Sequence, residues 1–75
     1  MRYLIKYDFA KFQPSWNRGL ASRLGDNNEG VIVAAETPKA AIETFNASLL
    51  AGERFNPFYL KVGPVLADYK PFRTI

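Results

Sequence analysis

The sequence predicts a single α+β domain, in which a small antiparallel sheet of three to four strands carries one main helix on one face. Three observations lead to this fold class. Residues 2–9 alternate between two sets of side chains, residues 31–35 form a short apolar run, and residues 38–51 repeat apolar side chains at helical spacing. Elements with one apolar face must pack together to bury it. A chain of 75 residues has room for one such core, so residues 1–75 form one domain.

The most clearly patterned stretch is EGVIVAAETPKAAIETFNASLLAG, residues 29–52. Thr37 is a good N-cap, because its hydroxyl can accept a hydrogen bond from a free amide one turn later. Pro38 suits the first helical position, where the N–H has no partner anyway. An apolar stripe follows, made of Ala41, Ile42, Phe45 and Leu49. Gly52 is expected to end the helix, which gives a predicted range of 38–51.

Two further segments are expected to be strands because their side chains alternate. In residues 2–9 the predicted core face consists of Tyr3, Ile5, Tyr7 and Phe9. In residues 58–62 it consists of Phe58, Leu60 and Val62, with Tyr59 and Lys61 facing out. We expect Gly63 and Pro64 to interrupt this run and a short fourth strand to follow over residues 65–69, because proline cannot donate to a strand ladder.

Residues 10–30 are predicted to be a long excursion with a short helix over about 15–24. Ser15 could cap this helix, in which Trp16, Leu20 and Leu24 recur every four residues. Gly19 in its middle costs about 1 kcal/mol relative to alanine, so the helix needs tertiary support. The run GDNNEG, residues 25–30, has turn composition and leads into the next strand.

One helix can cover only one face of the sheet, so the reverse face is expected to be open. It would show basic, apolar and aromatic side chains, namely Arg2, Leu4, Lys6, Tyr59 and Lys61. The middle strand would add either Val31, Val33 and Ala35 or Ile32 and Ala34. Trp16 with Arg18 and Arg23 forms a second cluster, in which the tryptophan either fills the core or lies exposed as an anchor. The predicted partner-binding residues are Arg2, Lys6, Tyr59, Lys61, Trp16, Arg18 and Arg23.

The composition offers no catalytic chemistry. The chain has no histidine and no cysteine, which removes the commonest general base, the thiolate nucleophile and the commonest metal ligands. The carboxylates are scattered, and no glycine-rich phosphate loop occurs. We therefore expect a non-enzymatic protein without metal or cofactor. The first residues do not resemble a signal peptide, and no apolar segment approaches the length that spans a membrane. We therefore expect a cytoplasmic protein.

In its order of segments the chain resembles small phage-encoded anti-CRISPR proteins. The resemblance rests on YLIKYD, on EGVIVAAETPKAAIETFN, on FYLKV and on the closing LADYKPFRTI, and it leaves out residues 10–30, where this chain is longer. The similar proteins are type I inhibitors with one helix on a small antiparallel sheet. The resemblance implies an inhibitor that binds a host protein or ribonucleoprotein complex in the bacterial cytoplasm and blocks its engagement of DNA. Lys6, Tyr59 and Lys61 would then be contacts, joined by Arg18 and Arg23.

Two other functions remain open from the residues themselves. A net charge of +3 and a basic sheet face are compatible with a small nucleic-acid-binding protein. A thin core and exposed strand edges are compatible with an assembly subunit, so the chain could be a monomer or a homodimer. The inhibitor function is the leading hypothesis.

Overall fold

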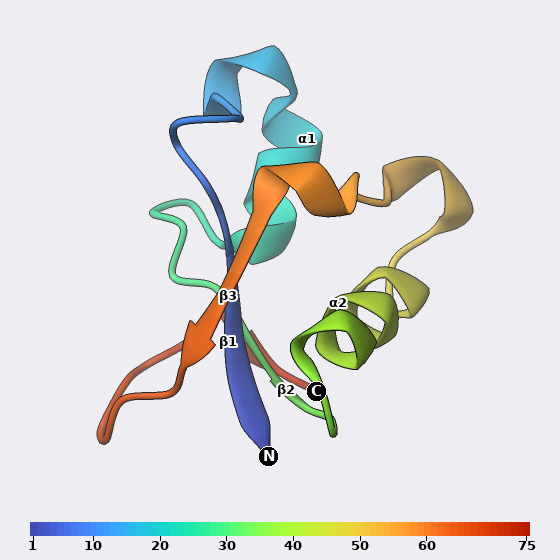
Figure 1. The fold of residues 1–75 in the computed structure, drawn as a ribbon. Helices are drawn as coiled ribbons and strands as arrows, with labels where there is room; N and C mark the ends of the chain where they lie inside the picture. Colours follow the sequence, from blue (N-terminus) through green and yellow to red (C-terminus); the bar gives the residue numbers. More distant parts are fainter.

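The computed structural model describes all residues from 1 to 75 and contains a four-stranded sheet in the order β3-β1-β2-β4. The principal helix α2 (Pro38–Ala47) lies on one side of this sheet, as Figure 1 shows. The strands are β1 (Arg2–Tyr7), β2 (Val31–Ala34), β3 (Leu60–Pro64) and β4 (Arg73–Thr74). The predicted α+β class is confirmed.

The central strand β1 pairs antiparallel with both β2 and β3. Strand β4 pairs parallel with β2, so the sheet is mixed rather than wholly antiparallel. The predicted fourth strand over residues 65–69 is wrong, because the last strand forms instead at Arg73–Thr74. The predicted break at Gly63 and Pro64 is also wrong, since both belong to β3. An edge strand tolerates proline because no further strand needs its N–H.

Helix α2 begins as the sequence predicts and ends four residues early, at Ala47 instead of residue 51. The Thr37 hydroxyl accepts a hydrogen bond of 3.1 Å from the Ala40 amide. At the other end the Asn46 side chain bonds both the N–H and the C=O of Phe55, each at 2.9 Å. These bonds turn the chain away from the helix axis, and Gly52 lies in a separate 3₁₀ turn, η3 (Ala51–Glu53).

The core lies between α2 and the sheet. The predicted stripe of α2 faces inward, with Ala41 and Phe45 fully buried and Leu49 nearly so. From the sheet, Ile5, Val31 and Val33 are likewise fully buried. Val31 and Val33 therefore belong to the helix side, and Ile32 and Ala34 belong to the reverse face, which decides between the two alternatives for the middle strand. The full buried cluster is Ile5, Tyr7, Phe12, Ala21, Leu24, Val31, Val33, Ala41, Phe45, Leu49, Phe55 and Leu60.

The reverse face of the sheet is not open as predicted. Leu4 and Ile32, which oppose each other across β1 and β2, are both buried. The segment 65–72 returns on the side of the sheet opposite α2 and covers them (Figure 1). The Tyr69 hydroxyl donates a hydrogen bond to the Glu29 carbonyl, and the Phe72 amide donates to Gly30 at 2.8 Å. These bonds fasten the segment to the start of β2.

Residues 8–30 connect β1 to β2 and include the predicted excursion over 10–30, in which three short turns replace the single helix expected over about 15–24. They are the 3₁₀ turn η1 (Pro14–Trp16), the helix α1 (Arg18–Ala21) and the 3₁₀ turn η2 (Ser22–Leu24). Asn17, and not Ser15, caps α1, because its side chain accepts a hydrogen bond of 3.0 Å from the Leu20 amide. No helix of the structure is long and apolar enough to span a bilayer.

Asn28 attaches the end of this excursion to the sheet. It is the one buried polar side chain, with 3 % of its surface exposed, and its φ is +52°. Its side chain accepts a hydrogen bond of 3.1 Å from the Tyr7 N–H and donates one of 2.9 Å to the Tyr7 C=O. Asn28 lies just before the start of β2 and continues the pairing of β1 there, as one more strand residue would.

We expect Phe45→Ala to lower the free energy of unfolding by about 3–5 kcal/mol, because it leaves a cavity under a fully buried ring. Urea denaturation monitored by circular dichroism measures this loss. Leu50→Ala is the control, since this side chain is 72 % exposed and its removal should change stability by less than about 0.5 kcal/mol. Equal losses in the two variants would contradict the placement of α2.

We expect Asn28→Gly to cost about 2–4 kcal/mol, because it keeps the backbone conformation and leaves two buried Tyr7 backbone groups without partners. Asn28→Ala should cost about 1 kcal/mol more, because alanine is strained at a positive φ. Thermal and urea unfolding of both variants measure these losses. Asn27→Ala, at the exposed neighbouring position, should be neutral. A neutral Asn28→Gly would mean that water replaces the side chain.

Candidate functional site

The end of the molecule where β1 stops and β3 starts carries a cluster of aromatic rings around Phe12. Phe12 is buried and contacts the rings of Tyr7, Trp16, Phe55 and Tyr59, with centroids 5.3, 6.0, 5.4 and 5.7 Å away. The outer members of this cluster are exposed. We call the set Phe9, Lys11, Trp16, Phe58 and Tyr59 the aromatic end.

Local backbone chemistry builds this end from two distant segments. After β1, the Asp8 carboxylate accepts a hydrogen bond from Ala10 at 2.9 Å and its C=O accepts from Lys11 and Phe12 at 2.9 Å, which turns Phe12 inward. On the other segment, Asn56 caps the 3₁₀ turn η4 (Pro57–Tyr59) through a 3.0 Å bond from Phe58. The Asp8 amide donates to the Tyr59 carbonyl at 2.8 Å and joins the two segments.

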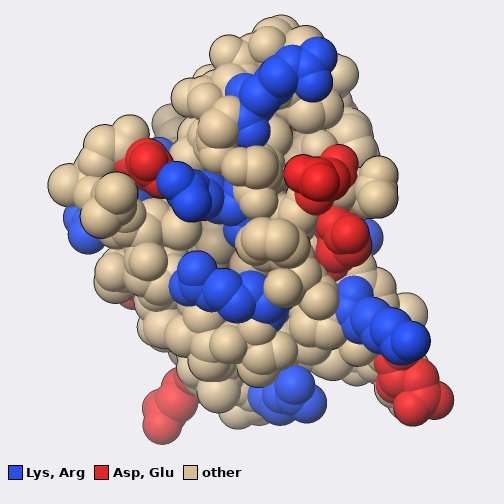
Figure 2. Space-filling view, turned by 180° about the vertical axis from the view of Figure 1, so that it is seen from behind, with Lys and Arg blue, Asp and Glu red and all other residues tan.

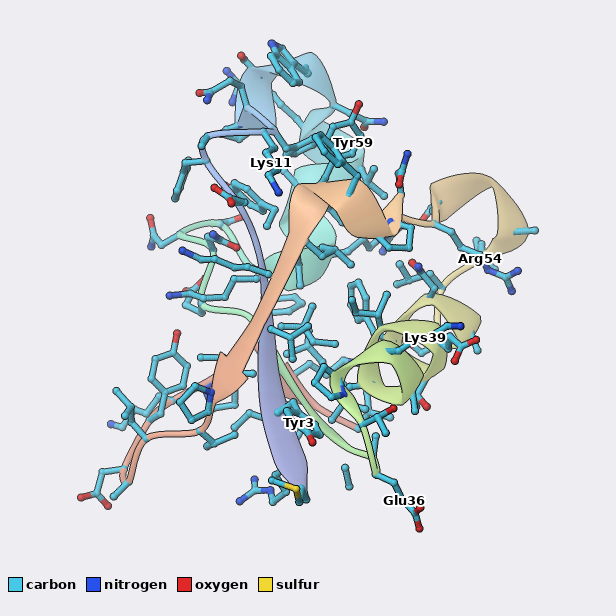
Figure 3. The ribbon with its side chains drawn as sticks, viewed as in Figure 1. Tyr3, Lys11, Glu36, Lys39, Arg54 and Tyr59 are labelled. Carbon is cyan, nitrogen blue, oxygen red and sulfur yellow. The ribbon has the colours of Figure 1, made fainter.

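Trp16 and Phe58 are the most exposed rings of the aromatic end, at 64 % and 61 %. Trp16 stands edge-on to Phe12, at an interplanar angle of 79°. Phe58 stands edge-on to Tyr59, and the Lys11 ammonium lies 4.6 Å from the Phe58 ring centroid. Lys11 and Tyr59 lie together at this end in Figure 3. Trp16 is thus an exposed residue mounted on a buried ring, and not core filler.

Three aromatic residues are placed differently from the sequence prediction. Tyr59 was expected on the open sheet face beside Lys61, but it lies in η4 and packs, half-buried, against Phe12. Phe58 and Phe9 were expected in the core, but both are more than half exposed. The alternation of apolar and polar side chains continues beyond one end of each strand. β1 ends at Tyr7 and not at residue 9, and β3 begins at Leu60 and not at residue 58.

The basic residues of the sheet do share a face, as predicted. Lys6 of β1 and Lys61 of β3 are directly opposite each other in the strand register. Arg2 lies on the same face, further along β1, and is exposed. The Lys6 ammonium lies 5.8 Å from the centroid of the Tyr69 ring, which comes from the covering segment. Tyr69 was not among the predicted site residues, because residues 65–69 were expected to form a strand.

The two arginines of the predicted second cluster have different environments. Arg18 is exposed at the start of α1, close in sequence to Trp16, and lines a small hollow of about 260 Å³ with Tyr7 and Asp26. Arg23 in η2 forms an ion pair with Glu53 in η3. Arg23 therefore connects two turns of the structure, and its charge is already matched.

A groove of about 820 Å³ lies beside the start of β1. Its walls come from the first residues of β1, the end of β3 and the segment 65–69, and Tyr3, Ile32 and Leu66 contribute apolar surface to it. The charged residues at its rim are Arg2 and Asp68. The groove contains no pair of side chains that resembles a nucleophile and its base.

The face of the molecule drawn in Figure 2 carries mixed charges. Figure 2 shows Lys and Arg side chains separated by neutral residues, with Asp or Glu beside several of them. No group of three or more His, Cys, Asp or Glu side chains gathers as a metal site would require. The aromatic end and the Lys6–Lys61 pair are therefore the two surfaces whose composition points to a ligand.

A scan of protein-family models finds none that matches this chain, and searches of curated proteins and of solved structures also find no match. The resemblance to anti-CRISPR proteins thus stays a prediction from the sequence.

The phenol that supports the aromatic end provides a pH-dependent test of its packing. Burial raises the pKa of Tyr7 above its ordinary value of 10.0. Above pH 10 the unfolded chain loses this proton while the folded chain keeps it, so the free energy of unfolding must fall as pH rises. We expect Tyr7 to contribute a decline of up to about 1.4 kcal/mol per pH unit in that range.

Urea denaturation between pH 8 and the folded-state pKa measures this decline, and Tyr7→Phe should make it shallower. Tyr59→Phe is the matched control and should keep the wild-type slope, because Tyr7 is retained. If Tyr7→Phe and wild type decline in parallel, the Tyr7 hydroxyl has access to water.

Proposed function

We propose that this chain is a non-enzymatic protein-binding domain that inhibits a host protein or ribonucleoprotein complex, and that the aromatic end is its contact surface. The observation that carries the proposal is that Trp16 and Phe58 are exposed and pack on the buried or half-buried rings of Phe12 and Tyr59. Both rings are more than 60 % exposed, and both are fixed, directly or through Tyr59, to the buried Phe12.

Several physical arguments support a protein partner at this surface. Tryptophan and tyrosine are among the residues that dominate the energetics of protein interfaces. Exposed apolar residues that gather at one end of a small protein mark interaction sites more often than singly scattered ones do. Rings held edge-on by a buried neighbour lose little conformational entropy on binding, so their burial is converted efficiently into affinity.

The partner class is supported by the sequence resemblance to type I anti-CRISPR inhibitors. An inhibitor that occludes or distorts a large complex needs no catalytic residues, which agrees with a chain that has no histidine and no cysteine. The proposed place of action is the cytoplasm of the host bacterium.

We expect the double variant Trp16→Ala/Phe58→Ala to weaken inhibition by at least about thirtyfold, because loss of one interface hot spot costs 2 kcal/mol or more. The assay expresses the protein in a bacterium with active type I CRISPR immunity and measures plaque formation by a targeted phage. Binding to the purified surveillance complex by biolayer interferometry gives the affinity. Thermal melts establish that the variants remain folded.

Leu50→Ala/Leu66→Ala is the matched control, because these side chains are 72 % and 66 % exposed and lie outside the aromatic end. It should inhibit as wild type does. Equal losses in both double variants would contradict the aromatic end as the contact surface. A wild-type protein that neither restores plaques nor binds the complex would contradict the partner class.

A further inference from the structure

We propose that the Lys6–Lys61 pair holds a backbone phosphate of single-stranded nucleic acid, at a site distinct from the aromatic end. The two lysines are cross-strand partners in β1 and β3. The Asp8 amide donates to the Tyr59 carbonyl two register positions further along, so the alternation of an antiparallel ladder makes Lys6 and Lys61 a hydrogen-bonded pair. Their Cα atoms are then about 5.5 Å apart, with both side chains on one face.

This arrangement breaks an elementary rule of sheet design. Like charges directly opposite each other on one face of a sheet destabilise it. Neither lysine forms an ion pair, because the one ion pair of the structure is Arg23–Glu53. Where a local rule is broken without a visible gain in stability, a functional requirement is the usual reason. An anion bound between the two ammonium groups would remove the repulsion.

The structure also holds Lys6 in place. Gly30 has φ +90°, and a Cβ there would come within 2.8 Å of the Lys6 Cγ and 2.6 Å of the Ile5 carbonyl. Glycine at this position therefore leaves room for the stem of Lys6. The Tyr69 ring lies 5.8 Å from the Lys6 ammonium, and its hydroxyl is bonded to the Glu29 carbonyl. Lys6 is thus positioned before any ligand arrives, which lowers the entropy cost of binding.

The geometry of the surrounding strip favours a linear polyanion. Arg2 lies four residues before Lys6 on the same face, which is about 13 Å along the strand. Between them Gly63 leaves open space above β3, because a Cβ there would meet nothing within 4 Å. Cations spaced along one face beside an aromatic ring are typical of surfaces that follow a single strand of nucleic acid.

The residue type is compatible with phosphate. A lysine ammonium binds phosphate oxygens as a point charge, without the fixed direction of the arginine fork. Both members of the pair are lysines, and the strip is short, so only a few phosphates can be contacted. We therefore infer weak, salt-sensitive binding without base specificity.

Fluorescence anisotropy with a labelled oligothymidylate of about 12 nucleotides, at low salt, tests the proposal. We expect Lys6→Gln/Lys61→Gln to weaken binding at least tenfold and to lower the slope of log K against log salt by about 0.7, which corresponds to one phosphate contact. The melting temperature should stay unchanged or rise, because the repulsion between the lysines is removed. Lys6→Arg/Lys61→Arg keeps both charges and should bind.

Lys39→Gln/Arg54→Gln is the matched control, since it removes two exposed cations from the side of α2 shown in Figure 3. It should bind nearly as wild type does; an equal loss would show attraction by net charge alone and overturn the proposal. If Lys6→Gln prevents folding, the single variant Lys61→Gln, at an exposed position, must still weaken binding. Displacement of the oligonucleotide by polyglutamate at equal anion concentration would also overturn it.

This proposal is independent of the inhibitory function. Trp16→Ala/Phe58→Ala should leave oligothymidylate binding intact, and the glutamine pair leaves the aromatic end unchanged. Failure of either proposal is therefore visible without failure of the other.

Discussion

The two hydrogen bonds between Asn28 and the main chain of Tyr7 join the excursion to the sheet, and much of the remaining structure depends on them. Without a partner at this point, β1 would end with buried polar groups just where the aromatic cluster begins. An asparagine side chain carries a donor and an acceptor on one rigid amide, so it can replace a strand residue. Asparagine also accepts a positive φ more readily than other residues with a Cβ, which lets the chain turn into β2.

The parts of the fold that the sequence predicted are those determined by local chemistry. Thr37 and Pro38 specify the start of α2 through interactions within one turn, and the stripe around Phe45 follows from helical periodicity alone. The end of α2 was predicted wrongly because it depends on Asn46 bonding the backbone of Phe55, nine residues away. The parallel strand β4 was missed for a similar reason: Arg73 and Thr74 pair with β2, about forty residues earlier in the chain.

The candidate site was predicted in part, and the errors have a common physical origin. The Lys6–Lys61 pair follows from alternation in two strands, which places both residues on the reverse face. Tyr59 and Phe58 were misplaced because alternation does not reveal where a strand starts, and Pro57 begins a 3₁₀ turn there. The signal that could have placed them is Asn56-Pro57, an N-cap followed by proline, which has the same form as Thr37-Pro38. Nothing local indicates that Tyr69 meets Lys6.

The aromatic end and the Lys6–Lys61 pair affect the stability of the folded protein in opposite directions. This difference helps to explain how one small domain can carry both surfaces. The aromatic end adds to stability, because its exposed rings rest on Phe12 and thereby extend a thin core. The lysine pair subtracts from stability through repulsion, which is tolerable only where the strands are otherwise well held. Here Lys6 lies on β1, which is paired on both sides, whereas Lys61 lies on the edge strand β3. A domain of this size can therefore keep a strained cation pair for a ligand, provided that its apolar contact surface also serves as core.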